Sequence, residues 1–164
     1  MRRARSSSRR IARRLRHRPV LAVASGGGHW VELMRLRPAW EGMSVVYASV
    51  NPDYAAHVAP HDYFVLPDGN LHTKIALVRV FFSALALVLR VRPAAVVSTG
   101  AAPGYFAMVF ARLYGSRTIW VDSIANADEL SLSGSNIRLF ADVWLTQWEH
   151  LAGANGPCYH GRVL

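Results

Sequence analysis

The residues best placed to do chemistry form a glycine-rich turn that ends in a histidine. Ser25, Gly26, Gly27 and Gly28 follow a short apolar run and precede His29. Glycines let the backbone N–H groups of such a turn approach an anion, and the N-terminus of the following helix favours negative charge. A histidine there can donate to a phosphate or accept a proton from a hydroxyl group. The alternative is a structural histidine that packs against the next loop.

Two later segments place polar residues after apolar runs of the same kind. Thr99 and Gly100 follow the run Ala95–Val97. Asp122 follows the run Thr118–Val121. Because the carboxyl ends of parallel strands meet at one edge of a sheet, we expect these residues to lie near the first glycine turn. A carboxylate there can accept a proton from a sugar hydroxyl group or orient the histidine. The alternative is an aspartate that caps a helix or holds its own loop.

The first turn departs from the known nucleotide-binding fingerprints. Gly26 and Gly28 meet the first spacing of the dinucleotide motif, but Val31 stands where its third glycine belongs. No acidic residue ends the next predicted strand, and no Gly-Lys-Ser/Thr sequence of the NTPase type follows. A stand-alone nucleotide-binding Rossmann domain is therefore a disfavoured alternative, and we expect no cofactor.

Metal chemistry is also disfavoured by the sequence. The histidines show no ligand spacing matched to carboxylates, and Cys158 is the single cysteine of the chain. One thiol allows neither an internal disulfide nor a metal site built from several cysteines. We therefore expect no metal ion at the predicted site.

Apolar runs bounded by turn residues predict the elements that position these side chains. Strands are expected at 20–24, 44–48, 63–66, 95–97, 118–121 and 143–146, and helices at 29–36, 54–58, 73–91, 104–114 and 135–140. Strands that alternate with helices favour a parallel sheet covered on both faces. The predicted fold class is α/β, a Rossmann-like parallel sheet with helices on both faces.

One predicted helix is unusually apolar. Residues Ile75–Leu89 are apolar except for Arg79 and Ser83. A helix of this length spans only about 22 Å, which is short of the roughly 30 Å hydrocarbon core of a membrane. We expect one side to pack on the sheet and the other to lie in a lipid interface; the alternative is a helix buried on all sides. The residues predicted to meet the lipid are Lys74, Arg79, Phe81, Phe82 and Arg90.

The positive charge of the chain is concentrated at its start. The formal net charge is +9, yet residues 1–18 hold nine arginines and no acid, while the rest holds ten basic and ten acidic residues. Residues 1–18 are therefore predicted to be a disordered or membrane-surface tail, and 19–164 a single domain. We expect Arg13, Arg14 and Arg16 to adsorb on an anionic membrane surface. A solvated tail, a transit peptide and nucleic-acid binding are the alternatives, and the last is not favoured.

Five motifs in order resemble those of the asparagine-linked glycosylation protein fourteen family and its bacterial exopolysaccharide relatives of the PssD type. The resemblance runs from about Pro19 to the C-terminus. The motifs are Ser25–His29, Ser98–Gly104, Val121–Ala125, Leu130–Gly134 and Ala141–Trp148. The resemblance implies the N-terminal half of a GT-B glycosyltransferase, here as a separate chain. Residues 157–164 of this chain resemble the closing segment of the family, which is expected to dock on a partner chain.

The resemblance also implies a function. A membrane-associated subunit would bind a polyprenyl-diphosphate-linked saccharide and recruit a donor-binding glycosyltransferase chain that holds a UDP-sugar. It would lie peripherally on the cytoplasmic face of the inner membrane and show little activity alone. The turn Ser25–Gly28 with Thr99 and Gly100 would bind the acceptor, and His29 or Asp122 would assist removal of its proton.

The sequence departs from the family at one of these positions. The family tends to read Glu-Ser-Phe-Ala-Arg where this chain has Asp122-Ser123-Ile124-Ala125-Asn126. A hypothesis of another class follows, in which the chain is a non-catalytic scaffold for membrane and partner. Substitution of His29 and Asp122 in the assembled complex separates the two.

Overall fold

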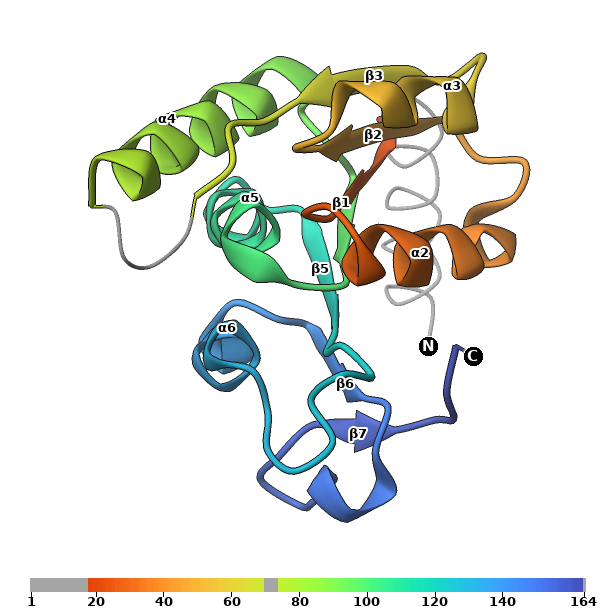
Figure 1. Cartoon of the computed structure of the whole chain (residues 1–164), viewed down its shortest axis with the longest axis vertical. Coiled ribbons are helices and arrows are strands. Elements are labelled where there is room, and N and C mark those ends of the chain that lie inside the picture. The colour runs from red at the N-terminus through yellow and green to blue at the C-terminus, as the bar shows by residue number, and fades with distance from the viewer. Residues whose placement is uncertain (1–17, 70–73, 164) are drawn as a thin grey trace, which may run out of the picture.

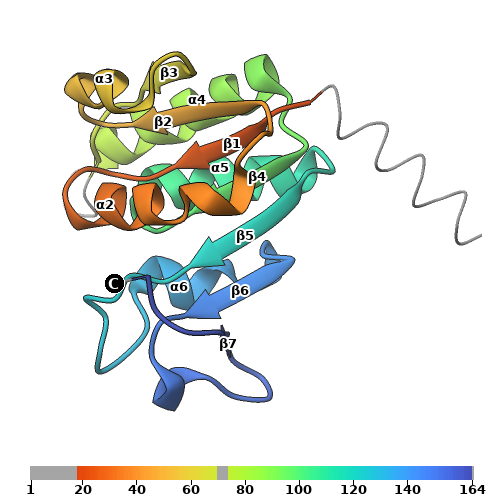
Figure 2. The same cartoon turned by 90° about the vertical axis from the view of Figure 1, so that its right-hand side faces the viewer.

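The computed structural model describes residues 18–69 and 74–163, and these build one parallel sheet with helices on both sides (Figure 1). Within this part of the chain the sheet has seven strands in the order β3-β2-β1-β4-β5-β6-β7, and every neighbouring pair is parallel. The strands run side by side through the molecule (Figure 2). The predicted α/β class is confirmed.

The strands agree with the predicted runs to within one or two residues. They are β1 (Val20–Val23), β2 (Val45–Ser49), β3 (Asp62–Val65), β4 (Ala95–Ser98), β5 (Arg117–Val121), β6 (Val143–Thr146) and β7 (Cys158–Tyr159). The last strand was not predicted, because two residues are too short to give an alternating or continuous apolar pattern.

The helices follow the predicted alternation with the strands. They are α2 (Gly28–Arg35), α3 (Ala55–Val58), α4 (Lys74–Val91), α5 (Ala101–Leu113) and α6 (Leu132–Asn136). Short 3₁₀ turns are η1 (Arg37–Trp40), η2 (Pro52–Tyr54), η3 (Ile137–Leu139) and η4 (Glu149–Leu151). Helix α5 begins three residues earlier than expected, so the second glycine turn leads directly into it.

The strand order places a topological switch between β1 and β4. The chain runs outward from β1 to β2 and β3, and then returns to β4 on the other side of β1. Val23 at the end of β1 is aligned with Ser98 at the end of β4. In open parallel sheets, ligands bind in the crevice outside the strand ends at such a point. Both glycine turns therefore leave the sheet side by side at the expected place for a site.

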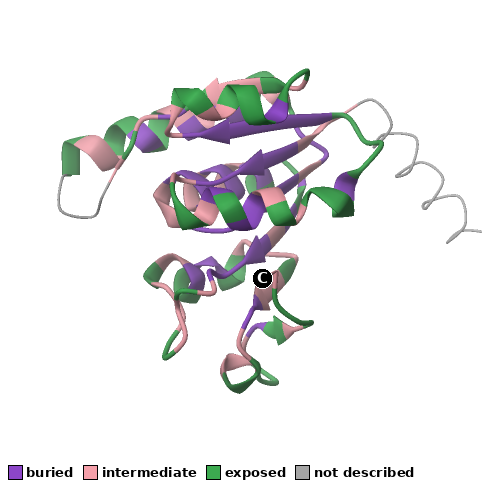
Figure 3. Cartoon of the chain, turned by 45° about the vertical axis from the view of Figure 1, so that its right-hand side comes forward, coloured by how far each residue is buried: buried purple, intermediate pink, exposed green. Residues whose placement is uncertain are grey.

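Helices α4, α5 and α6 cover one face of the sheet. Leu21, Val96 and Trp120 of the sheet pack there against Val88 of α4 and Met108 of α5, and all five are buried. The purple strands of Figure 3 show that the buried residues lie mainly in the sheet. This apolar layer fixes the strands whose ends carry the site.

The opposite face is covered unevenly. Trp30 and Leu33 of α2, Trp40 of η1 and Val58 of α3 pack on β1 and β2. Over β4, β5 and β6 this face instead lines an open apolar cavity, which is described below. Helices on both faces are thus confirmed, but the second layer covers only part of the sheet.

Helix α4 exposes a stripe of apolar side chains. Phe82 is 60% exposed, and Ile75, Val78 and Leu89 are also exposed, at helical spacing. Phe81 packs edge-to-face on Phe110 of α5, with ring centroids 4.8 Å apart. In the single chain α4 is therefore not buried on all sides. No helix in the described ranges has the length and hydropathy needed to cross a membrane.

The basic residues predicted to meet lipid fall in two groups. Lys74, Arg79 and Arg90 are exposed on α4, and the guanidinium of Arg90 lies 5.0 Å from the centroid of the Phe64 ring. Arg13, Arg14 and Arg16 lie outside the described residues.

Candidate functional site

Two helix N-termini meet at the carboxyl ends of β1 and β4. Helix α2 begins after Gly27 and α5 after Gly100, so neither N-cap residue has a side chain to cap its helix. The first turns of α2 and α5 also lack acidic residues. The N–H groups at such ends carry a partial positive charge and attract anions. The edge can thus hold a phosphate or diphosphate group between the two turns.

Hydrogen bonds to η2 and β2 fix the shape of the first glycine turn. Gly27 has a φ of 63°, which favours glycine, and its N–H group donates to the hydroxyl oxygen of Tyr54 at 3.1 Å. The Ser25 carbonyl accepts a hydrogen bond from the hydroxyl group of Ser49 at 2.9 Å. Gly27 and Gly28 are exposed. The turn therefore presents backbone, rather than side chains, to a ligand.

His29 and Thr99 join the two turns by a reciprocal pair of hydrogen bonds. The Thr99 hydroxyl donates to the His29 carbonyl oxygen at 2.6 Å, and the Thr99 carbonyl oxygen lies 2.9 Å from His29 Nδ1. A carbonyl oxygen only accepts, so we assign the ring proton to Nδ1. The lone pair then lies on Nε2. Because the side chain is partly exposed, at 29%, this nitrogen can accept a proton from a bound molecule.

Gly100 allows the imidazole ring to lie against the second turn. Its φ is 141°, and a Cβ atom there would stand 2.6 Å from His29 Cε1. Any side chain would displace the ring or the backbone. The predicted residues of the two turns are thus brought together by β1 and β4.

Asp122 lies behind this edge and faces its own loop. Its side chain accepts hydrogen bonds from the Ser131 hydroxyl group at 2.6 Å, the Ser131 N–H group at 2.9 Å and Trp120 Nε1 at 3.2 Å. The residue is only 1% exposed. These contacts favour the alternative in which Asp122 holds the loop that follows β5.

Glu32 is a site residue that the sequence reasoning missed. It lies on α2 one turn after His29 and is 4% exposed. Its Oε1 accepts hydrogen bonds from the Ile124 N–H group at 2.8 Å and the Ser123 hydroxyl group at 3.0 Å. The sequence signal that could have identified it is the spacing of three residues between His29 and Glu32, which places both side chains on one side of a helix.

An aromatic cluster supports α2 on the side away from α5. Trp30 stacks on Tyr54 with ring centroids 4.6 Å apart and meets Tyr63 edge-on. The Tyr63 hydroxyl group donates to the Asn51 carbonyl oxygen. Burial raises the pKa of Tyr63 above its ordinary value. The cluster therefore holds neutral rings beneath the glycine turn.

The C-terminal segment runs back to α2 and to the residues that follow β6. The Val163 carbonyl oxygen accepts from Arg35, and its N–H group donates to Gln147 Oε1 at 2.9 Å. Gln147 in turn donates to the Asp122 carbonyl oxygen at 3.0 Å. The guanidinium of Arg162 lies 4.3 Å from the Trp148 ring centroid.

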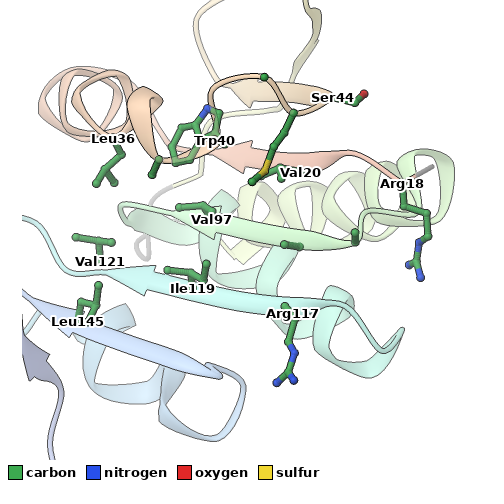
Figure 4. Close-up of a pocket in the computed structure, with 15 residues that line it drawn as sticks. Arg18, Val20, Leu36, Trp40, Ser44, Val97, Arg117, Ile119, Val121 and Leu145 are labelled. Atoms are coloured by element: carbon green, nitrogen blue, oxygen red, sulfur yellow. The ribbon is translucent and has the colours of Figure 1, made fainter. Parts of the chain in front are cut away.

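An open cavity lies away from the glycine turns. It has a volume of about 670 Å³ and lies on the partly uncovered face of the sheet. Figure 4 shows Val97, Ile119 and Leu145 pointing into it from β4, β5 and β6. Arg18 and Arg117 lie at one end. Away from these arginines its lining is mainly apolar, so it offers a surface for apolar contact.

The sequence matches a family and a curated relative. The model of the family "Oligosaccharide biosynthesis protein Alg14 like" matches residues 67–163. A segment of 52 residues is 36% identical to a UDP-N-acetylglucosamine transferase subunit ALG14 from Candida glabrata. That segment is 30% of this chain and 22% of the fungal protein.

The fold is similar to parts of larger solved structures. The MurG structure from Acinetobacter baumannii superposes with a TM-score of 0.71 at 14% identity, over 88% of this chain and 45% of that one. A UDP-N-acetylglucosamine 2-epimerase from Rickettsia bellii gives a TM-score of 0.66 at 14% identity, over 89% and 45%. This chain thus spans less than half of either protein.

The two kinds of similarity agree. The solved structures have GT-B type folds, and the Rossmann-like sheet with its switch at β1 and β4 is the architecture of a GT-B half. The family match covers more than half of the chain. The chain belongs to the Alg14-like family of oligosaccharide biosynthesis proteins.

Proposed function

We propose that this chain is the acceptor-binding subunit of a two-chain glycosyltransferase. The reaction is transfer of a sugar from a UDP-sugar to a polyprenyl-diphosphate-linked saccharide. The observation that carries the proposal is the meeting of two uncapped helix N-termini beside the partly exposed His29 in a member of this family. The curated relative, named as a transferase subunit, supports a separate donor-binding chain.

The acceptor diphosphate occupies the edge between the two glycine turns. The backbone N–H group of the exposed Gly28 faces its oxygens, and the first turn of α5, which follows Thr99 and Gly100, lies on the other side. The positive ends of α2 and α5 stabilise the negative charge. Binding the diphosphate here fixes where the acceptor sugar lies, which supplies the orientation on which transfer depends.

His29 takes the proton of the acceptor hydroxyl group. As the hydroxyl oxygen bonds to the anomeric carbon of the donor sugar, the bond from that carbon to UDP breaks, and the proton moves to Nε2. The Nδ1–H group stays on the Thr99 carbonyl oxygen, so the ring keeps its orientation. Asp122 maintains the loop after β5 rather than exchanging protons, because its oxygens already accept bonds from Ser131 and Trp120.

The exposed side of α4 holds the subunit on a membrane surface. Apolar side chains at 75, 78, 82 and 89 enter the interface, and Lys74, Arg79 and Arg90 lie near anionic headgroups. The arginines at 13, 14 and 16 add electrostatic attraction. The lipid-linked acceptor is thereby presented at the cytoplasmic face of the inner membrane, where the protein lies peripherally.

The donor-binding chain covers the apolar cavity over β4, β5 and β6. Burial of Val97, Ile119 and Leu145 by a partner removes apolar surface from water, which favours association. Residues 157–163, which run from β7 beside β6 to the contact of Val163 with Arg35, contribute to the same assembly. In this proposal the partner holds the UDP-sugar, so we expect the single chain to have little or no activity.

The test is transfer of radiolabelled sugar from a UDP-sugar to a lipid-diphosphate acceptor by the complex recovered from the native host. We expect His29→Gln to lower kcat by roughly 10²- to 10⁴-fold with assembly intact. Asp122→Asn should lower the melting temperature far more than the rate per folded complex. An unchanged rate in His29→Gln would instead make the chain a scaffold, and full turnover by the single chain would contradict the need for a partner.

A further inference from the structure

Glu32 is a buried carboxylate to which the proposed mechanism gives no role. It is only 4% exposed on α2, where Leu33 and Trp30 on either side belong to the apolar core. A carboxylate in such a place costs free energy unless its oxygens are paired. One oxygen is well satisfied: Oε1 accepts bonds from Ser123 and Ile124.

The second oxygen of Glu32 faces the histidine. Among the described residues Oε2 has no hydrogen-bond partner. It lies 3.9 Å from His29 Nδ1, which is too long for a hydrogen bond but close enough for an interaction between charges once the ring is protonated. The N–H group of Ile124 holds the carboxylate at this distance, and a backbone group is a more rigid anchor than a flexible side chain.

We propose that Glu32 is a positioning residue that stabilises the positively charged form of His29 during transfer. The inference rests on the proposed function. When Nε2 takes the acceptor proton, the ring becomes an imidazolium, and its charge faces a fixed carboxylate in a largely buried site. Glu32 itself exchanges no proton in this role. A buried acid beside a histidine base acts in the same way in hydrolase triads, where it stabilises the imidazolium.

The same residue links the base to the loop after β5. Ile124 and Ser123 bind Oε1, while the Ile124 carbonyl oxygen accepts a bond from Trp148 Nε1 at 2.8 Å. The carboxylate is thus anchored from the far side of the sheet edge. Its orphaned oxygen is then directed at His29 by contacts that do not involve the ring.

The test is a double-mutant cycle on the assembled complex. Glu32→Gln keeps the length of the side chain and an oxygen that can accept from Ile124, but it removes the charge. We expect kcat to fall roughly 10- to 100-fold with little change in KM for either substrate. In a His29→Gln background the same substitution should change kcat less than about twofold, because the base on which it acts is gone. Glu41→Gln, at an exposed carboxylate, is the matched control and should leave both constants unchanged.

Two results would overturn the inference. Either Glu32→Gln has wild-type kcat, or it lowers kcat equally with and without His29, as a purely structural residue would. If Glu32→Gln does not fold, Glu32→Asp and Glu32→Asn replace it. Both variants shorten the side chain equally, but only the aspartate keeps the negative charge. Only Glu32→Asp should therefore retain activity. Absence of transfer by the wild-type complex is a separate result, because it rejects the proposed function itself and the role of Glu32 with it.

Discussion

At the scale of single residues, the site depends on how closely the two glycine turns approach each other. The ring of His29 fits against Gly100 because no Cβ is present there. We predict that Gly100→Ala disrupts the His29–Thr99 pair, because the new methyl group would lie 2.6 Å from the ring and the φ of 141° disfavours a side chain. Nitrogen NMR of the imidazole should show a single Nδ1–H tautomer in the wild-type chain and its loss in the variant.

Gly153→Ala is the control for this substitution. A Cβ at Gly153 would have no neighbour within 4 Å, so the alanine should leave the His29 signals unchanged. Identical spectra for Gly100→Ala and the wild type would show that the close approach does not hold the ring.

At the scale of elements, α4 combines two roles on its two sides. Val80, Ala84 and Val88 pack on the sheet, while Phe82 is 60% exposed on the other side. We predict that Phe82→Glu lowers binding to vesicles rich in anionic lipid by roughly tenfold or more, because a charge replaces an apolar contact with the interface. Flotation of the chain with such vesicles measures the change.

Leu113→Glu is the matched control for the α4 substitution. Leu113 is 74% exposed at the end of α5, and the change in net charge is the same. Equal losses from the two variants would mean that net charge, and not the apolar side of α4, governs binding.

At the scale of the whole molecule, the partly uncovered face of the sheet leaves an apolar surface open as a cavity. We predict that Ile119→Glu prevents association with the donor-binding chain, since docking would bury an unpaired charge. Co-purification of tagged chain with its partner measures this. Leu139→Glu, at a side chain 83% exposed on η3, should leave association intact. Recovery of the partner by the Ile119 variant would place the interface elsewhere.

Much of the fold was predictable from local pattern alone. The apolar runs gave the positions of six strands, because a buried parallel strand is a short continuous apolar segment bounded by turn residues. The glycine turns after two of these runs predicted where the chain leaves the sheet. The position of β6 was predicted to the residue, at Val143–Thr146. Strand β7 was missed because its pairing with β6 depends on a neighbour in space.

By itself, the sequence determined the alternation of elements and the residues of the two turns, because periodicity and glycine content act locally. Only the tertiary structure decided what those turns face. It placed Thr99 against His29 across 70 residues of sequence, turned Asp122 toward its own loop, and brought Glu32 between the histidine and Ile124. It also left part of one sheet face uncovered. These contacts follow from the strand order, and strand order is set by long-range packing that no local pattern records.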